Sequence, residues 1–307
     1  MVTLMVSPHT RDVCVCSVSP LGHSGDVAGH RTVVRRHPPR WGLCWISRAE
    51  DGHEALSASA TARRSRNSPC MIIRVTVVLA LKCADGVVLG ADSQITDSER
   101  GLSYPAQKLH PFGETAAWGG SGARAVLLEL EGEFDRGAAA VLGADNVGRE
   151  LQERVVPLLR HHYDNFIEQV PGQQKSGATP ATFVMVAGYA RGEPFIVDID
   201  PHGLIGRYED AGFHAIGSGS AMAQQAGALL AHFRMTERDV DHGVLAAVRV
   251  LDALRITSPS VGGPIDVYRL TADGAHALSD EDLERVRARV RRWAELENEA
   301  LDHLPRS

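Results

Sequence analysis

The pattern of apolar and polar positions changes abruptly at Met71. Residues 1–70 show neither a helical nor a strand period over any useful window, and they are rich in Arg, His, Ser and Pro. A segment of this kind lacks the apolar content to fold alone. From residue 71 onward, apolar runs recur between turn signals. We therefore expect one folded domain over residues 71–307, preceded by a basic extension over residues 1–70 that is disordered, a propeptide or not translated.

Strands are indicated first within this domain. Two apolar, β-branched runs, Val75–Leu81 and Val87–Ala91, flank the turn signal Ala84-Asp85-Gly86 and predict a β-hairpin. A second hairpin is predicted from Leu109 to Trp118, turning at Gly113-Glu114. Further short strands are predicted over residues 182–187, 194–198, 204–208, 214–216 and 265–270.

Helical spacing separates these strands into blocks. Apolar positions three and four apart predict helices over residues 122–135, 146–170, 221–233 and 237–254. Thr236 is the expected N-cap of the last of these. A capping box, Ser279-Asp280-Glu281-Asp282, predicts a charged C-terminal helix over residues 279–302. Because strands and helices come in blocks rather than in strict alternation, we expect antiparallel sheets with helices outside them.

Composition and charge narrow the class of protein. Hydrophobic residues make up 44% and charged residues 23% of the chain, as in soluble globular proteins. No apolar run reaches the ~18 residues of a membrane span, and the first residues lack the basic leader of a signal peptide. Residues 1–70 hold nine Arg against five Asp and Glu, a net charge of +4. Because the whole chain carries −6, residues 71–307 carry −10. This acidic domain argues against nucleic acid or an anionic membrane as the main partner, and a cytoplasmic location is expected.

The cysteines do not indicate a metal site. Cys14, Cys16, Cys44 and Cys70 lie in the extension, and Cys83 is the one cysteine of the domain. One residue between Cys14 and Cys16 does not fit the usual zinc spacing. We therefore expect no metal and no other cofactor. A single cysteine in the domain favours a reducing compartment.

Thr76, near the start of the first predicted hairpin, has a hydroxyl that suits nucleophilic catalysis if it is the first residue of the active chain. A threonine hydroxyl is a poor nucleophile unless a base takes its proton, and a terminal threonine carries such a base in its own α-amino group. The pKa of an α-amine is about 7.7–8.0, which suits proton transfer near neutral pH. A neighbouring lysine would keep that amine neutral, and an aspartate would hold the lysine in place.

The segment from Thr76 to Asp92 resembles the opening hairpin of proteasome β subunits. In that family the nucleophilic threonine begins a strand, Asp-Gly forms the turn, and the next strand ends in Ala-Asp. The resemblance puts the family's catalytic aspartate on Asp92 and its catalytic lysine on Lys108, within Gln107-Lys108-Leu109-His110-Pro111. The chain has three lysines against 29 arginines, so a lysine at this position is a specific match.

A glycine-rich segment extends the resemblance. Ala117-Trp118-Gly119-Gly120-Ser121-Gly122 is similar to the family segment whose glycine N–H forms the oxyanion hole. The resemblance implies that role for Gly119, with Gly120 as the alternative, because the hairpin is slightly shorter than the family's. Backbone donors at this place would stabilise the tetrahedral intermediate of acyl transfer.

Two later segments complete the resemblance, which reaches to about Leu278. Gly217-Ser218-Gly219-Ser220 is similar to the family's Gly-Ser-Gly-Ser at a strand-to-helix junction, which implies that Ser218 lies beside the nucleophile. Val261–Val267 is similar to the family's Gly-Gly-x-Ile-Asp-Val strand. The fold that the resemblance implies is an α+β, four-layer α/β/β/α sandwich of two antiparallel sheets.

The sequence departs from the family at three positions. The family usually carries Asp and Ser just before the Gly-Gly pair, where this chain has Ser258 and Val261. Family propeptides normally end in Gly, whereas Val75 precedes Thr76 here, and a β-branched residue hinders self-cleavage. Valine GTG codons also serve as bacterial start codons. We therefore expect translation to start at position 75, with removal of the initiator methionine leaving Thr76 terminal.

The resemblance implies a threonine-type endopeptidase that hydrolyses peptide bonds through an acyl-enzyme on Thr76. It also implies a homo-oligomeric ring, a peptide or unfolded-protein substrate, and an ATP-dependent unfoldase as a candidate partner. Two alternatives stay open at this point. One is a catalytically silent structural subunit of the same fold, and the other is an N-terminal-nucleophile amidase that acts on small amides.

Overall fold

The computed structural model describes residues 3–6, 13–16, 76–97, 102–168, 179–258 and 261–305. The chain divides into two units, Met1–Met71 and Ile72–Ser307. In the first unit, strand β1 (Thr3–Val6) pairs antiparallel with β2 (Val13–Cys16), which the sequence pattern did not predict. Each strand has only four residues, which are too few to register as a period. The rest of the predicted extension lies outside the described residues.

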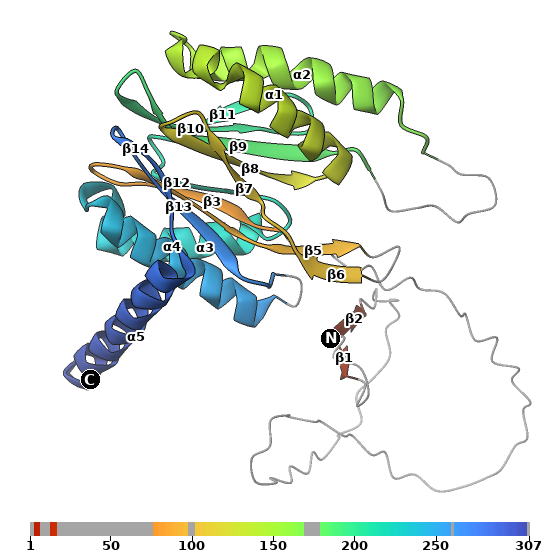
Figure 1. Ribbon diagram of the computed structural model, residues 1–307. Helices are drawn as coiled ribbons and strands as arrows, with labels where there is room; N and C mark the ends of the chain where they lie inside the picture. The colour runs from red at the N-terminus through yellow and green to blue at the C-terminus, as the bar shows by residue number, and fades with distance from the viewer. Residues whose placement is uncertain are drawn as a thin grey trace, which may run out of the picture. The chain divides into compact units, whose positions relative to one another are not determined.

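Most of the described strands of the second unit form two five-stranded antiparallel sheets, shown in Figure 1, while β5 (Gln94–Asp97) and β6 (Leu102–Pro105) pair only with each other. One sheet, of order β12-β3-β4-β13-β14, consists of β3 (Val78–Lys82), β4 (Val87–Asp92), β12 (Phe213–Ile216), β13 (Ile265–Thr271) and β14 (Gly274–Ala277). The other, of order β11-β10-β9-β8-β7, consists of β7 (Leu109–Phe112), β8 (Ala116–Gly122), β9 (Thr182–Ala190), β10 (Glu193–Ile199) and β11 (Ile205–Arg207). Both predicted hairpins are confirmed.

Helices cover the outer face of each sheet (Figure 1). The sheet that contains β9 is covered by α1 (Arg124–Gly143) and α2 (Val147–Asp164). The sheet that contains β3 is covered by α3 (Ser220–Leu230) and α4 (Val240–Thr257). The predicted four-layer α/β/β/α sandwich is therefore confirmed. No helix among the described residues is long and apolar enough to cross a membrane.

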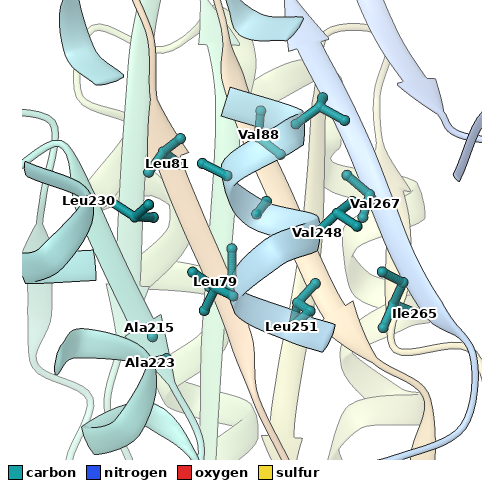
Figure 2. Packing of buried hydrophobic residues seen from close by; sticks show 14 of the residues in the cluster. Leu79, Leu81, Val88, Ala215, Ala223, Leu230, Val248, Leu251, Ile265 and Val267 are labelled. Carbon is teal, nitrogen blue, oxygen red and sulfur yellow. The ribbon is translucent and has the colours of Figure 1, made fainter. Parts of the chain in front are cut away.

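Strand β3 shows how the sequence builds these layers. Successive side chains of a strand point to opposite faces, so the residues of β3 alternate between the helical side and the layer between the two sheets. Leu79 and Leu81 pack under α4, while Val78 and Ala80 lie between the two sheets. Figure 2 shows Leu79 and Leu81 on one side of α4, with Val248 of that helix on the other side, near Val267. Each large apolar side chain buried in this way contributes about 1.5–3 kcal/mol, so β3 is firmly held on both faces.

The C-terminal helix α5 (Asp280–Asp302) begins as the sequence predicts. The Ser279 hydroxyl accepts from the Asp282 backbone N–H, and the Asp282 carboxylate accepts from the Ser279 backbone N–H, which completes the capping box. The first turns of α5 pack on α4 through Leu283 and Val286, and the helix then extends away from the sandwich (Figure 1).

Several sequence expectations need correction. Helix α2 ends at Asp164, before the predicted end at residue 170. The N-cap of α4 is Asp239, whose carboxylate accepts from the His242 N–H, and not Thr236, which lies in the 3₁₀ turn η2 (Met235–Glu237). The pattern also missed three short strands, because their polar content resembles that of loops. These are β5 (Gln94–Asp97), β6 (Leu102–Pro105) and β14.

Candidate active site

Thr76 lies directly before β3, and two backbone contacts hold it against the turn that follows β12. The Thr76 N–H donates to Ser218 Oγ at 3.0 Å, and the Gly219 N–H donates to the Thr76 carbonyl at 3.1 Å. Gly217 has φ of +91°, and a Cβ there would lie 2.3 Å from the Thr76 carbonyl oxygen. A glycine is therefore needed at position 217 to bring Ser218 and Gly219 this close to Thr76.

Asp92 ends β4 and is fully buried. Its Oδ1 accepts from the Val77 N–H at 3.1 Å, and its Oδ2 accepts from the N–H groups of Gln94 at 3.2 Å and Gly262 at 3.4 Å. Hydrogen bonds of this kind stabilise a carboxylate in a buried position. The register of the first hairpin thus places a fixed negative charge beside the start of β3.

Lys108 lies directly before β7, and its ammonium joins the other two residues. Nζ lies 2.7 Å from Asp92 Oδ1 and 3.4 Å from Thr76 Oγ1. The lysine is 7% exposed, and this burial lowers the pKa of Lys108, while Asp92 acts in the opposite direction. The ammonium is therefore held by the carboxylate in a position where it also contacts the Thr76 hydroxyl.

Gly119 and Gly120 of β8 present opposite faces of the strand. A Cβ at Gly119 would lie 3.1 Å from the Lys108 carbonyl oxygen and 3.1 Å from Val78 Cγ1, on the side of β3. A Cβ at Gly120 would meet the Leu127 side chain of α1, on the outer face of the sheet. Of the two, Gly119 therefore lies toward the Thr76 end of β3.

A family model described as "Proteasome subunit" matches residues 74–269, which is more than half of the chain. The chain belongs to the proteasome subunit family. Thr76, Asp92, Lys108, Gly119 and Ser218 all fall inside the matched range.

Curated relatives agree with this assignment. "Proteasome subunit beta 1" of Streptomyces avermitilis is 26% identical over 228 residues, which cover 72% of this chain and 75% of the relative. "Proteasome subunit beta" of Archaeoglobus profundus is 28% identical over 224 residues, which cover 72% of this chain and 96% of the relative. The chain is therefore a member of the proteasome family that resembles β subunits.

Solved structures share the fold. Anbu, described as an ancestral beta-subunit, from Yersinia bercovieri matches with a TM-score of 0.58 and 16% identity, covering 76% of this chain and 99% of its own. Anbu from Hyphomicrobium sp. strain MC1 matches with a TM-score of 0.55 and 19% identity, again covering 76% and 99%. At these identities the likeness concerns the fold.

The structure adds residues to the proteasome-like site that sequence reasoning did not single out. Asp266 of β13 is half-buried, and burial raises its pKa, while the Lys108 backbone N–H acts in the opposite direction. The Ser93 hydroxyl donates to the Pro264 carbonyl at 2.6 Å, which ties the end of β4 to the start of β13. The polar position of Asp266 within the apolar run Ile265–Leu270 was a signal that could have identified it.

Two of the three positions at which the chain departs from the family, 258 and 261, hold buried residues. Ser258 is buried at the C-cap of α4, where its N–H donates to the Leu254 carbonyl at 2.8 Å. Val261 is 3% exposed and belongs to the apolar cluster under α4. The apolar Val261 side chain thus supplies core packing at a position where the resemblance expects a hydroxyl.

Within residues 76–97, 102–168, 179–258 and 261–305, no group of three or more His, Cys, Asp or Glu is arranged to hold a metal ion. The Thr76 hydroxyl is instead contacted by the Lys108 ammonium, which is itself paired with Asp92.

Proposed function

We propose that this proteasome-family chain is a threonine-type endopeptidase with Thr76 as its nucleophile. The observation that carries the proposal is the position of Lys108 Nζ, 3.4 Å from Thr76 Oγ1 and 2.7 Å from Asp92 Oδ1. An ammonium beside a hydroxyl favours the alkoxide character that nucleophilic attack requires. A chain that serves only as a scaffold has no use for a buried lysine and aspartate in this arrangement.

The proposed reaction is amide hydrolysis in two stages. The free α-amine of Thr76 takes the proton from Oγ1, which attacks the substrate carbonyl carbon. The Gly119 N–H stabilises the negative oxygen of the tetrahedral intermediate. The intermediate expels the amine product, which receives the proton, and leaves an ester on Thr76. Water activated by the same α-amine then attacks the ester, which releases the acid product and the free hydroxyl.

Ser218 orients the base in this mechanism. Its Oγ lies 3.0 Å from the Thr76 nitrogen, so it fixes the direction of the amine lone pair. Lys108 keeps the amine neutral at working pH by like-charge repulsion. The mechanism thus assigns a separate task to each of the four side chains and uses no metal or other cofactor.

The mechanism requires a free amine on Thr76, so the active chain must begin there. Val75 lies outside the described residues. Initiation at position 75 followed by removal of methionine would supply the amine without self-cleavage. The residues upstream would then be absent from the active protein.

The proposed setting is a homo-oligomeric ring in the cytoplasm that takes peptide or unfolded-protein substrates. One similar structure is titled "Helical Assembly of the Anbu Complex from Pseudomonas aeruginosa", with a TM-score of 0.56 and 17% identity over 76% of this chain. A partner unfoldase that consumes ATP would unfold protein substrates and deliver them to the ring. The acidic domain favours neither nucleic acid nor an anionic membrane as a partner.

Intact-mass analysis tests the nucleophile and the start site together. The protein would be isolated from its native host and treated with a peptide epoxyketone, which reacts with a terminal threonine through its hydroxyl and amine. We expect a chain that begins at Thr76 and gains the mass of one probe, and no gain for Thr76→Ala. A chain in which Thr76 is internal and unlabelled would refute the enzyme assignment.

A catalytically silent structural subunit is the second candidate. It is favoured by Ser258 and Val261, which replace the Asp and Ser that the family uses near the terminal amine.

An amidase that acts on small amides is distinguished from the endopeptidase by the substrates that it cleaves. Cleavage of fluorogenic peptides without cleavage of simple N-acyl amides supports the endopeptidase, and the reverse preference supports the amidase.

A further inference from the structure

A second buried polar cluster lies outside the proposed catalytic residues. His214 Nε2 lies 2.8 Å from Asp198 Oδ2, and His214 Nδ1 lies 3.2 Å from Gln224 Nε2. The His214 ring also stacks on Tyr208, with ring centroids 3.4 Å apart and an interplanar angle of 10°. His214 and Asp198 are each 8% exposed. Both ring nitrogens of His214 and one face of its ring thus have a defined partner.

The cluster joins the two sheets. Asp198 belongs to β10. Its neighbours Val197 and Ile199 pack against the layer of α1 and α2, so the Asp198 side chain points to the layer between the sheets. His214 belongs to β12 and likewise alternates with Ala215, which packs toward α3 and α4. Figure 2 shows Ala215 on that helical side. A hydrogen-bonded contact between an imidazole and a carboxylate therefore crosses the sandwich where apolar residues would otherwise meet.

The same cluster brackets the turn that carries Ser218. His214 lies four residues before Ser218 on β12, and Gln224 lies six residues after it on α3. The contact between His214 and Gln224 closes a loop around Gly217, Ser218 and Gly219. Register provides a second link, because β12 pairs with β3 so that His214 faces Ala80 and Ile216 faces Val78. The position of the turn relative to Thr76 is thus tied to His214.

We propose that His214 is a positioning residue for the Thr76 amine, acting through the turn that carries Ser218. This inference rests on the proposed function. Asp198 holds the imidazole from the opposite sheet, and Gln224 ties the start of α3 to the end of β12. Together they set the 3.0 Å distance from the Thr76 nitrogen to Ser218 Oγ and the 3.1 Å distance from the Gly219 nitrogen to the Thr76 carbonyl oxygen.

Asp198 shows why an apolar ring does not serve equally well at position 214. Its Oδ1 accepts from the Gly206 N–H at 3.1 Å, and its Oδ2 depends on His214. Removing the imidazole donor leaves an oxygen of the buried Asp198 carboxyl without its partner, and the structure must shift to bring water to it. A shift of this kind in β12 would move Ser218, and misplacement by about 1 Å can lower a rate about 10²-fold.

The experiment compares His214→Phe with His214→Gln in the active protein, whose chain begins at Thr76. Phenylalanine keeps the stacking on Tyr208 and loses both polar contacts, while glutamine keeps a donor near the position of Nε2. We expect kcat on a fluorogenic peptide to fall about tenfold or more in H214F with KM changed less than about twofold, since the change acts on the amine and not on binding. H214Q is expected to recover most of kcat. His202→Phe, at an exposed histidine, is the matched control.

Hydrogen exchange at the Gly219 N–H provides a readout that does not depend on activity. That N–H donates to the Thr76 carbonyl, so its exchange reports directly on the position of the turn. We expect faster exchange in H214F and near-normal exchange in H214Q. A folded H214F with unchanged kcat and unchanged Gly219 exchange would overturn the proposal.

Two further outcomes are also decisive. If H214F does not fold, Gln224→Leu is used in its place, because it removes the contact that closes the loop and leaves the contact between His214 and Asp198 intact. The kcat and the Gly219 exchange rate of this variant then decide whether the cluster positions the turn. If the unsubstituted chain hydrolyses no peptide and binds no epoxyketone, the proposed endopeptidase fails. The Gly219 exchange rates of the variants then decide alone whether His214 positions the turn.

Discussion

The ammonium of Lys108 lies 2.7 Å from Asp92 Oδ1, although the two side chains are only 6% and 0% exposed. Removing both charges from water costs several kcal/mol, and a pair of apolar residues of similar volume often gives equal or greater stability. Stability alone therefore does not explain the pair. Its second contact, from Lys108 Nζ to Thr76 Oγ1, fits the chemical purpose that we propose for the buried charge.

Replacement of Lys108 tests that purpose. We expect Lys108→Met to lower kcat/KM for peptide hydrolysis by about 10²-fold or more, because the hydroxyl and the amine lose the neighbouring positive charge. Lys108→Arg is expected to be similarly impaired, since a planar guanidinium does not fit where a single ammonium contacts both oxygens. Lys82→Met, at the end of β3, is the control. Normal hydrolysis by K108M would contradict the assigned role.

Asp92→Asn tests the stability of the same pair. The amide keeps the shape of the side chain but leaves the Lys108 charge buried without a counter-ion, so we expect a loss of about 3–5 kcal/mol in the free energy of unfolding. Denaturant titration measures this loss. Asp241→Asn is the matched control, because Asp241 pairs with Arg269 at the surface and its removal should cost less than about 1 kcal/mol. Equal losses in the free energy of unfolding for the two substitutions would contradict the larger cost expected for breaking the buried pair.

Gly243 allows α4 to approach the sheet closely. A Cβ at this position would lie 2.3 Å from Cys83 Sγ and 3.0 Å from Val88 Cγ2. We expect Gly243→Ala to destabilise the protein by about 1–3 kcal/mol, because the core must shift to admit the methyl group. Gly132→Ala in α1, where the nearest atom lies 3.5 Å away, should instead stabilise by up to about 1 kcal/mol through helix propensity. Thermal unfolding of both variants checks the opposite signs.

The capping box of α5 predicts a specific dependence on pH. The Ser279 hydroxyl, the Ser279 N–H and Arg285 together lower the pKa of Asp282 to about 2. Because this folded-state pKa lies below the ordinary value of 3.8, the stabilisation is complete above about pH 4 and is lost as the pH falls through 2. We expect Ser279→Ala to raise the pKa of Asp282 toward 3.8, as measured by an NMR titration of its carboxyl carbon. An unchanged pKa in S279A would assign the effect to the Ser279 N–H and Arg285 instead of the hydroxyl.

Cys83 is expected to resist alkylation in the folded protein. Burial, followed by the charges of Asp85 and Asp239, raises the pKa of its thiol to about 12, and the thiolate is the reactive form. At pH 8 the thiolate fraction is then on the order of 10⁻⁴. Peptide mapping after iodoacetamide treatment should find Cys83 unmodified under native conditions and modified in denaturant. Rapid native modification would contradict the burial of this side chain under α4.

The sequence alone determined the parts of this protein that depend on neighbouring residues. The apolar run from Val77 to Leu81 and the Asp85-Gly86 turn specify a hairpin whose register brings Asp92 back beside the start of β3. Ser279 and Asp282 specify the first turn of α5. These features follow from side-chain periodicity, turn geometry and capping, which act over a few residues. The position of Lys108 and the four-layer fold were anticipated through the family resemblance.

Only the tertiary structure decided how distant segments meet. Ser218 reaches the Thr76 nitrogen across 142 residues, and no local pattern encodes that contact. The orientation of Gly119 toward β3 follows from how the two sheets stack. The pair of His214 and Asp198 exists because one strand from each sheet turns a polar side chain into the layer between them. Such contacts depend on the packing of whole layers, whose free energy is shared among many residues and is not visible in any one segment.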